Sequence, residues 1–251
     1  MKNDTSWGEV AQWYDGVVEG DDSYQQKVIA PNLMRLLALK EGERILDLAC
    51  GQGFFARTIA ETGAQVFGVD ISKELVAVAK QKGTERIEYH VAPAHKLDFL
   101  KEQSVEKGIC VLALQNMENY QEVLREVSRV LVDGGKFYLV LNHPAFRIPK
   151  ESEWGYDEEK GVQYRRLDRY ISEGREEIEM HPGKQSKEVT VSFHRPLQSY
   201  FKAFEKAGFA VTRMEEWMSH RKSDSGPRAK AENRARGEFP LFACFELVKK
   251  G

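Results

Sequence analysis

Segments that resemble strands alternate with segments that resemble helices over residues 44–142. Short apolar or alternating runs predict strands at residues 44–48, 65–70, 86–91, 109–114 and 136–142. Amphipathic segments predict helices at residues 54–61, 73–82 and 120–131. Such alternation is typical of a mostly parallel sheet with crossover helices, so the expected fold class is α/β with helices on both faces.

The alternation stops after residue 142 and resumes about fifty residues later. Strand-like pieces at residues 164–180 and 188–193 flank a turn at 181–183, which predicts an antiparallel hairpin inserted after the fifth strand. A helix is then expected from Pro196 to Gly208, followed by strands at 209–217 and 241–249 with a polar loop, 219–238, between them. We therefore expect a core in residues 1–142, an inserted acceptor-side cap in 143–195, and completion of the core in 196–251.

The N-terminal part of residues 1–142 is expected to form a lid. Residues 24–39 are predicted to be helical in two pieces around Pro31. Ahead of them, Trp7, Trp13 and Tyr14 make the start of the chain more aromatic than a solvated tail should be. A segment that closes over a bound ligand and excludes water would give these rings a role.

Composition narrows the class of protein. The 251 residues carry 37 Lys and Arg against 39 Asp and Glu, a formal charge of −2, which disfavours a globally basic nucleic-acid binder. The longest apolar run, residues 109–114, is far too short for a membrane helix, and the first residues lack the apolar stretch of a secretory signal. Three widely spaced cysteines indicate neither a disulfide framework nor a metal site. We expect a soluble, cytoplasmic protein.

A glycine turn and an acidic residue stand at the ends of the first two predicted strands. Gly51 and Gly53 follow the first strand and open a helix, where a ligand can approach the backbone closely. Asp70 ends the second strand, 17 positions after Gly53, where a carboxylate can accept hydrogen bonds from the two hydroxyls of a ribose. Each feature alone is weak evidence, because glycine turns occur in many α/β loops. The pair indicates a nucleoside-containing ligand.

Four segments, in order, resemble the motifs of the class I S-adenosylmethionine-dependent methyltransferases, specifically the type 11-like small-molecule enzymes. Residues 45–55 are similar to the first motif, with its D-x-x-C-G-x-G glycine loop, and residues 66–72 to the second. Residues 94–99 are similar to the adenine-side loop of the family, and residues 126–135 to the helix and Gly-Gly turn before the fifth strand. The resemblance implies a Rossmann-like sheet of about seven strands, the last one antiparallel, and S-adenosyl-L-methionine as the cofactor.

The resemblance also implies a set of cofactor-binding residues. Asp47 and the backbone of residues 49–53 would surround the methionine part, Asp70 would hold the ribose, and Ile71 would lie against the adenine. The residues implied at the site are Tyr14, Asp47, Ala49, Cys50, Gly51, Gly53, Asp70, Ile71, Ala94, His95, Leu114 and Gln115. The chain departs from the family pattern at Pro93, where an acid often binds the adenine amino group, and at Lys107-Gly108, where the fourth strand is usually entered by Asp.

Two histidines are candidates for a catalytic base. His143 directly follows the fifth predicted strand and His194 ends the inserted hairpin, so both are expected at the edge of the sheet where ligands collect. Either could take a proton from a methyl acceptor near neutral pH. The alternative is that each imidazole only bonds backbone at the start of a loop.

Basic and aromatic residues of the second half leave the acceptor open. The arginines of the insert could clamp a carboxylate or a phosphate, although pairing with the many neighbouring acids is favoured; they are Arg147, Arg165, Arg166, Arg169 and Arg195. Trp154, Tyr164 and Phe193 could line an acceptor pocket or simply pack the hairpin. Six bases in residues 220–236 could contact RNA phosphates, but the segment lacks the interleaved aromatic residues that base stacking needs.

The favoured function is therefore methyl transfer to a small molecule, at oxygen or nitrogen, with no metal and no membrane or nucleic-acid partner. One alternative is an RNA methyltransferase that uses residues 220–236. The other is a non-catalytic cofactor-binding protein that regulates a partner.

Overall fold

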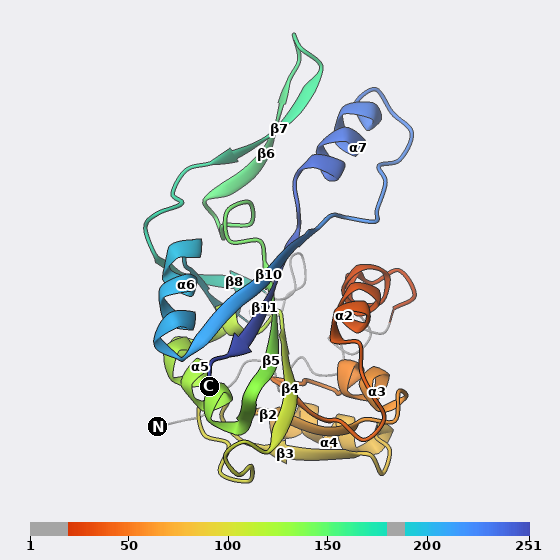
Figure 1. Ribbon diagram of the computed structural model, residues 1–251. Coiled ribbons are helices and arrows are strands. Elements are labelled where there is room, and N and C mark those ends of the chain that lie inside the picture. Colours follow the sequence, from red (N-terminus) through yellow and green to blue (C-terminus); the bar gives the residue numbers. More distant parts are fainter. Residues whose placement is uncertain (1–19, 180–188) are drawn as a thin grey trace.

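A seven-stranded sheet forms the centre of the computed structural model, which describes residues 20–179 and 189–251. Its strand order is β10-β11-β5-β4-β1-β2-β3 (Figure 1). The strands are β1 (Arg44–Leu48), β2 (Gln65–Asp70), β3 (Ile87–Val91), β4 (Val105–Val111), β5 (Leu131–Asn142), β10 (Phe209–Trp217) and β11 (Phe242–Lys249). Neighbours from β5 to β3 pair in parallel, whereas β11 runs antiparallel to both β5 and β10. The predicted α/β class and the antiparallel last strand are confirmed.

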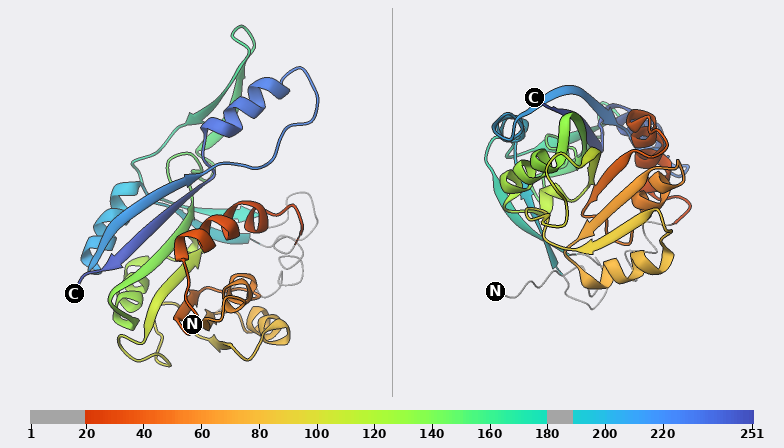
Figure 2. Two further views of the ribbon diagram at one scale, coloured as in Figure 1. Left: turned by 45° about the vertical axis from the view of Figure 1, so that its right-hand side comes forward. Right: turned by 60° about the horizontal axis from the view of Figure 1, so that its bottom comes forward.

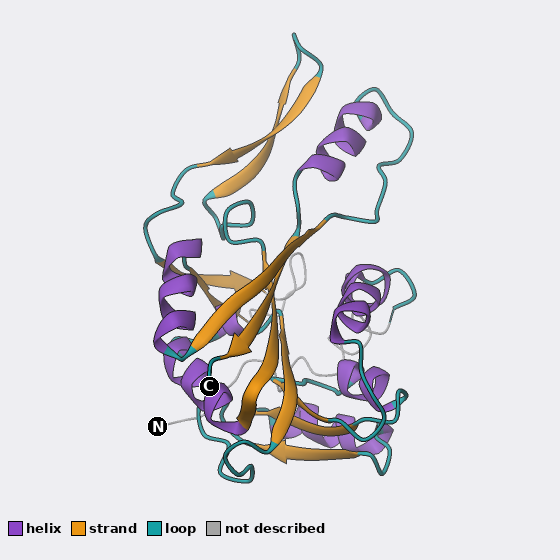
Figure 3. Cartoon of the chain, viewed as in Figure 1, coloured by secondary structure: helices purple, strands orange, loops and turns teal. Residues whose placement is uncertain are grey.

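Helices cover both faces of this sheet (Figure 3). One face carries α5 (Tyr120–Val130) and α6 (Leu197–Lys206); the other carries α2 (Ala30–Leu37), α3 (Phe54–Ala60) and α4 (Lys73–Lys82). Side chains of a strand alternate between the faces. Accordingly Leu46 and Leu48 pack in the core under α5 and α6, and Ile45 packs in the core under α2 and α3. The crossover pattern in the sequence therefore yields two apolar cores, one on each side of the sheet.

Two local predictions in this half are confirmed. Ser72 caps α4 by accepting a hydrogen bond from the Leu75 amide at 3.2 Å. A π-helical turn, η1 (Gln25–Ile29), leads directly into α2, whose first turn contains Pro31. Among the described residues, no helix is long and apolar enough to cross a bilayer.

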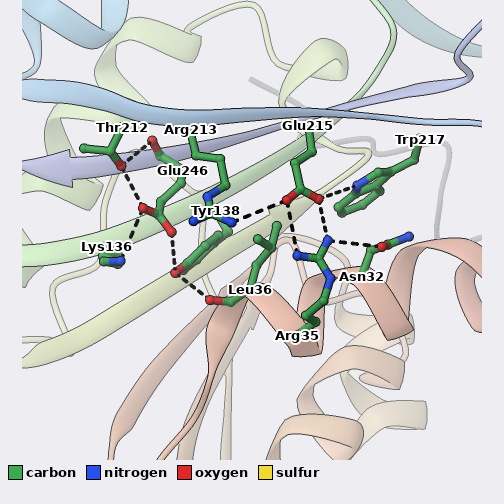
Figure 4. A network of polar contacts seen from close by, with 10 residues as sticks. All are labelled: Asn32, Arg35, Leu36, Lys136, Tyr138, Thr212, Arg213, Glu215, Trp217 and Glu246. Atoms are coloured by element: carbon green, nitrogen blue, oxygen red, sulfur yellow. Dashed lines mark hydrogen bonds and ion pairs between the residues drawn. The ribbon is translucent and has the colours of Figure 1, made fainter.

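Polar side chains fix α2 to the outer strands of the sheet (Figure 4). Arg35 of α2 forms an ion pair with Glu215 of β10, and the Tyr138 hydroxyl of β5 donates to the Leu36 carbonyl at 3.0 Å. That hydroxyl also lies 3.0 Å from the Glu246 carboxylate of β11. The helix that follows η1 is thus held by direct contacts to two strands, β10 and β5, and β11 supports the second contact through Glu246.

The predicted antiparallel hairpin after β5 is confirmed, and the described residues hold a second hairpin that the sequence analysis missed. β6 (Ser152–Asp157) pairs with β7 (Val162–Leu167), and β8 (Gly174–Glu179) pairs with β9 (Val189–His194). The predicted strand piece at residues 164–180 is thus divided between β7 and β8. β6 escaped the sequence analysis because its residues, SEWGYD, have no apolar alternation. The predicted turn at 181–183 lies outside the described residues.

Residues 219–238, predicted as a loop, contain α7 (Ala229–Glu238). Only Ala235 of this helix is buried, so the sequence has no apolar stripe to reveal it. The helix lies beside the β6–β7 hairpin, and the two project together from one end of the sheet (Figure 2). The Arg228 guanidinium lies 4.4 Å from the ring centre of Tyr156, which links them.

Two strand boundaries also differ from prediction. β4 runs from Val105 to Val111 instead of over 109–114, because Leu112 turns into the left-handed region with φ +53° and ends the strand. Its polar first half escaped notice; the Lys107 ammonium lies 2.7 Å from the Glu43 carboxylate. β5 begins at Leu131 and contains the predicted turn glycine Gly134, at φ +73°, as an irregularity within the strand.

Candidate active site

A cavity of about 330 Å³ lies at the carboxyl ends of β1, β2 and β4, the edge where ligands collect in open α/β sheets. Its lining combines the glycine turn after β1, the end of β2, residues 92–95 and residues 111–119. A smaller cavity of about 30 Å³ adjoins it and shares Ala49, Gly51, Val111 and Leu112. Asp47, Cys50 and Gln25 line only the smaller one. Two segments far apart in sequence, η1 and the turn after β4, therefore meet beside the glycine turn.

The glycine turn has a backbone shape that its glycines make possible. Gly51 and Gly53 have φ of +55° and +81°, a region that residues with a Cβ seldom adopt. A Cβ on Gly53 would also collide with the Tyr89 hydroxyl. The turn leads into α3, whose first amides lack intrahelical partners and can meet an anionic or polar ligand.

Asp70 supports the turn and faces the larger cavity at once. One carboxylate oxygen accepts a hydrogen bond from the Gly51 amide at 3.0 Å, and the other accepts one from the Ser72 amide at 2.9 Å. The residue is 9% exposed and lines the cavity. Burial raises the pKa of Asp70, while the two amides lower it. Each oxygen retains a lone pair that can accept from a ligand hydroxyl.

Asp47 is a buried carboxylate beside the smaller cavity. Its Oδ2 atom has no hydrogen-bond partner within residues 20–179 and 189–251. Burial, together with the nearby charge of Asp70, raises the pKa of Asp47 to about 7. An unpaired carboxylate oxygen in such a place would be satisfied by a cationic hydrogen-bond donor, because an isolated buried charge is costly.

Two non-glycine residues with left-handed backbone border both cavities. Ala49, at φ +59°, follows β1, and Leu112, at φ +53°, follows the neighbouring strand β4. Such conformations persist only where surrounding contacts enforce them, and they are frequent at ligand sites. The Gln115 side chain supplies one such contact by donating to the Leu112 carbonyl at 2.9 Å. Nothing in the sequence marked Leu112, because leucine has no preference for this conformation.

An ion pair on α5 is hydrogen-bonded to the backbone of residues 97–100, in the loop predicted to border the adenine. Glu126 accepts a hydrogen bond from the Leu97 amide at 2.7 Å, and Arg129 donates to the carbonyls of Leu97 and Leu100. Glu126 and Arg129 also pair with each other at 2.7 Å. The loop carries Ala94 and His95, which line the larger cavity together with Pro93 and Ile71.

The structure brings together most of the residues that the sequence analysis proposed. Lining one or both cavities are Asp47, Ala49, Cys50, Gly51, Asp70, Ile71, Ala94 and His95. Gly53 shapes the turn without lining a cavity. Leu114 and Gln115 are buried in η2 (Leu114–Asn116), behind the wall that Val111, Leu112 and Ala113 form. Tyr14 and the proposed lid lie outside the described residues.

The two candidate catalytic histidines line neither cavity. The Nε2 atom of His143 lies 2.8 Å from Glu216 of β10, and its Nδ1 atom accepts from the amides of Ala145 and Phe146. Burial lowers the pKa of His143, and Glu216 raises it. The Nε2 atom of His194 lies 2.7 Å from the Tyr170 carbonyl. These contacts correspond to the alternative interpretation, in which each imidazole bonds backbone at the start of a loop.

Arg195 ties the insert to the wall of the larger cavity. Its guanidinium donates to the carbonyls of Met117 and Glu118 at 2.8 and 3.3 Å, and lies 4.0 Å from the ring centre of Tyr120. The residue is 4% exposed. Because Met117 and Glu118 line the cavity, the last residue of the insert helps to fix its wall.

Within the described residues, the basic segment 220–236 is largely engaged by its own surroundings. Arg221 pairs with Asp22 at 3.4 Å, Arg228 pairs with Glu158, and Arg236 donates to Ser223 at 3.3 Å. Half of the segment is helical rather than an extended arm. These contacts correspond to a solvated, self-paired surface.

The two cavities fit the parts of S-adenosylmethionine. The Asp70 oxygens suit a ribose diol, the apolar residues Ile71 and Ala94 suit the faces of adenine, and the unpaired Asp47 oxygen suits the ammonium of the amino-acid part. Residues 46–139 match the family model of the methyltransferase domain. An S-adenosylmethionine-dependent methyltransferase from Mesorhizobium loti is 31% identical, with 87% of this chain and 96% of that chain covered and a TM-score of 0.72. The chain belongs to the class I S-adenosylmethionine-dependent methyltransferases.

The first curated relatives of this methyltransferase match about half of its length. The ubiquinone biosynthesis O-methyltransferase of Xanthomonas oryzae pv. oryzae is 30% identical over 136 residues, which are 51% of this chain and 55% of that protein. The demethylmenaquinone methyltransferase of Chlorobaculum parvum is 33% identical over 137 residues, which are 53% of this chain and 56% of that protein. The chain thus spans about half the length of these relatives.

Proposed function

We propose that this methyltransferase moves the methyl group of S-adenosylmethionine to an oxygen or nitrogen atom of a small molecule. The observation that carries the proposal is the double role of Asp70, which braces the glycine turn and borders a ligand-sized cavity at the carboxyl ends of three strands. The names of the relatives, which include ubiquinone and demethylmenaquinone methyltransferases, support a small-molecule acceptor.

Within this proposal, the residues at the two cavities divide the cofactor between them. Asp47, Cys50 and the turn residues Ala49, Gly51 and Gly53 hold the amino-acid part. Asp70 holds the ribose, and Ile71, Ala94 and His95 border the adenine. Leu114 and Gln115 act from behind the wall, because Gln115 fixes the carbonyl of Leu112. Tyr14 belongs to a proposed lid that excludes water.

Methyl transfer requires alignment more than acid–base chemistry. The cofactor supplies an activated methyl group on a sulfonium, so the protein must place an acceptor atom in line with it and keep water away. The strained residue Leu112 and residues 116–119 border the side of the cavity that leads away from Asp70. We place the acceptor there.

Residues 143–195 serve as the cap on that side, between a core of residues 1–142 and its completion by 196–251. The contact of Arg195 with the cavity wall supports this division, because it joins the end of the cap to Met117 and Glu118. The cap is too long for a simple connection and contains both hairpins. It is therefore the part that selects the acceptor.

The proposal is tested by incubating the protein with methyl-labelled S-adenosylmethionine and a cell extract separated into small-molecule and RNA fractions. We expect label in the small-molecule fraction and none after Asp70→Ala. Label in RNA would favour the alternative in which residues 220–236 bind nucleic acid. Tight cofactor binding with no labelled product in any fraction would favour a regulatory protein without turnover.

A further inference from the structure

The arginines of the cap fall into two groups. Arg166 pairs with Glu153 and Asp168, at 2.9 and 2.8 Å, and Arg169 pairs with Glu151 at 3.3 Å. These exposed pairs match the sequence prediction that arginines and acids of the insert neutralise one another. Arg147 and Arg165, in contrast, form no ion pair with an acid among the described residues.

Arg147 is half-buried, and its side chain has no hydrogen-bond or ion-pair partner in residues 20–179 and 189–251. Burial lowers the pKa of its guanidinium, although an arginine stays charged at any physiological pH. Five N–H donors on a partly desolvated cation are normally satisfied by an acceptor, because leaving them unmet is costly. Within the described residues, no acid therefore neutralises the positive charge of Arg147.

Arg165 places a second positive charge beside the first. Its Nε atom donates to the carbonyl of Phe146, the residue that precedes Arg147, at 2.9 Å. A second nitrogen donates to the Ser152 hydroxyl at 2.7 Å, so neutral groups alone accept from it. Burial lowers the pKa of Arg165, and the positive charge of Arg147 lowers it further, as expected for neighbouring cations. Glu153 is the acid that raises the pKa of Arg165, but its carboxylate is already paired with Arg166.

Neither arginine lines the two cavities, but the chain leads from the cavity edge of the sheet to both of them. Arg147 lies five residues beyond the carboxyl end of β5, and β5 is the neighbour of β4, whose carboxyl end borders both cavities. Arg147 also lies near Tyr24, which precedes the cavity residue Gln25. The Arg165 guanidinium lies 5.1 Å from the ring centre of Trp154, and Trp154 packs edge-to-face on Phe239. These two rings form an aromatic wall beside Arg165.

We propose that Arg147 and Arg165 bind an anionic group, a carboxylate or a phosphate, of the methyl acceptor. The inference rests on the proposed function, and it assigns the acceptor to the class of organic anions. Guanidinium groups suit both anions because their N–H donors match a pair of oxygens. An anion held here satisfies Arg147 and relieves the repulsion between the two cations.

Direct binding of two probes tests the site. Fluorobenzoate, followed by fluorine NMR, and inorganic phosphate, followed by phosphorus NMR, are titrated into the protein with S-adenosylhomocysteine present to fill the cofactor cavity. We expect saturable binding of one probe, which identifies carboxylate or phosphate as the preferred group. Arg147→Ala and Arg165→Ala should each weaken that binding about tenfold or more, the scale for a hydrogen bond to a charged group.

Matched variants separate a binding role from a folding role. Arg169→Ala removes the same charge from the same cap and should leave probe binding within about twofold, because Arg169 is exposed and already paired with Glu151. Arg147→Lys keeps the charge but loses the planar fork, so its binding should lie between those of wild type and Arg147→Ala. Failure of both probes to saturate the wild type would overturn the site, as would unchanged binding by Arg147→Ala.

A second arm distinguishes this inference from the proposed function. The small-molecule extract is separated on an anion-exchange resin before it is offered with labelled cofactor. We expect acceptor activity in the retained fraction and a loss of about tenfold or more with Arg147→Ala. Acceptor activity confined to the unretained fraction would contradict the anion site and leave methyl transfer intact. Probe binding through Arg147 without transfer to any fraction would contradict methyl transfer alone.

Discussion

The cofactor half and the cap are stabilised by different kinds of contact. Around the cofactor cavities, each bend of the chain is fixed by a short polar contact, such as Asp70 to the Gly51 amide or Glu126 to the Leu97 amide. In the cap, two short hairpins stand outside the main sheet, and their arginines and acids pair on exposed surfaces. The first arrangement fixes one shape, whereas the second tolerates change in sequence and in length.

The difference explains why the family model matches where it does. The matched family model spans residues 46–139 and stops near the end of β5, before the cap begins. A cofactor that is the same for every member requires the same turn, acid and loop brace. An acceptor that differs between members requires a part that can differ, and we propose that residues 143–195 are that part.

The largest effect is expected from Asp70→Ala. The substitution removes the ribose acceptor and also the brace on the Gly51 amide, so the affinity for S-adenosylhomocysteine should fall by about 1.5–3 kcal/mol. Isothermal calorimetry measures the change. Asp168→Ala, which removes an exposed acid of the cap, should leave that affinity unaltered, and equal loss in both variants would contradict the division between the two regions.

Sequence alone predicted the cofactor half well because its signals are local. A glycine that must adopt positive φ, a strand-end acid and an N-cap serine each reveal their role through residue type, as at Gly53, Asp70 and Ser72. Leu112 gave no such signal, because its backbone conformation is imposed by contacts such as the one from Gln115.

The cap and its surroundings were harder to predict for an energetic reason. β6 and α7 bury little apolar surface, so neither shows the periodicity that identifies a strand or a helix. The role of Arg195 was likewise hidden, since its partners are main-chain carbonyls some 77 residues away in sequence. Long-range contacts of this kind leave no mark on the local pattern.

The next largest effect is a pH dependence of cofactor affinity, which arises from Asp47 in the cofactor half. In the free protein the pKa of Asp47 is raised to about 7, so below that pH the carboxyl must lose a proton before it can bind an ammonium group. Affinity for S-adenosylhomocysteine should therefore rise about tenfold per pH unit below pH 7 and level off above it. Calorimetry from pH 5.5 to 8.5 tests this, with Asp47→Asn expected to show a flat profile.

The same group gives a second, opposite dependence in the absence of cofactor. The folded chain keeps a proton on Asp47 that the unfolded chain, with a pKa near 3.8, has released. This contribution to stability is complete below pH 3.8 and is lost as the pH rises towards 7. A stability difference between wild type and Asp47→Asn that did not grow over this interval would contradict the burial of an unpaired carboxyl.

A smaller effect is expected where the two regions join. Arg195→Ala leaves the carbonyls of Met117 and Glu118 without their donor, which should lower the free energy of unfolding by about 1–3 kcal/mol. Because the wall it holds is on the acceptor side, KM for the acceptor should rise while cofactor affinity stays nearly constant. Urea unfolding measures the free energy of unfolding, and steady-state kinetics measures KM. A selective loss of cofactor affinity would contradict the assignment of Arg195 to the acceptor side.

The smallest effect on turnover is expected from the histidines. His143 and His194 bond to Glu216 and to the Tyr170 carbonyl, so replacing either by Ala should reduce stability and change turnover by less than about tenfold. If one of them acts as the general base that the sequence suggested, turnover would instead fall by about 10²–10⁴ with unchanged cofactor affinity. Rates from pH 6 to 9 for both variants decide between these roles.

Hydrogen exchange with and without S-adenosylhomocysteine tests most directly whether the cofactor binds at the two cavities and leaves the projecting arm, formed by β6, β7 and α7, unaffected. We expect slower exchange at residues 49–52, 70–71, 111–113 and 116–119, which border the cavities, and no change in β6, β7 and α7. Protection confined to the arm, or none around Gly51 and Asp70, would contradict a cofactor site at the carboxyl ends of β1, β2 and β4.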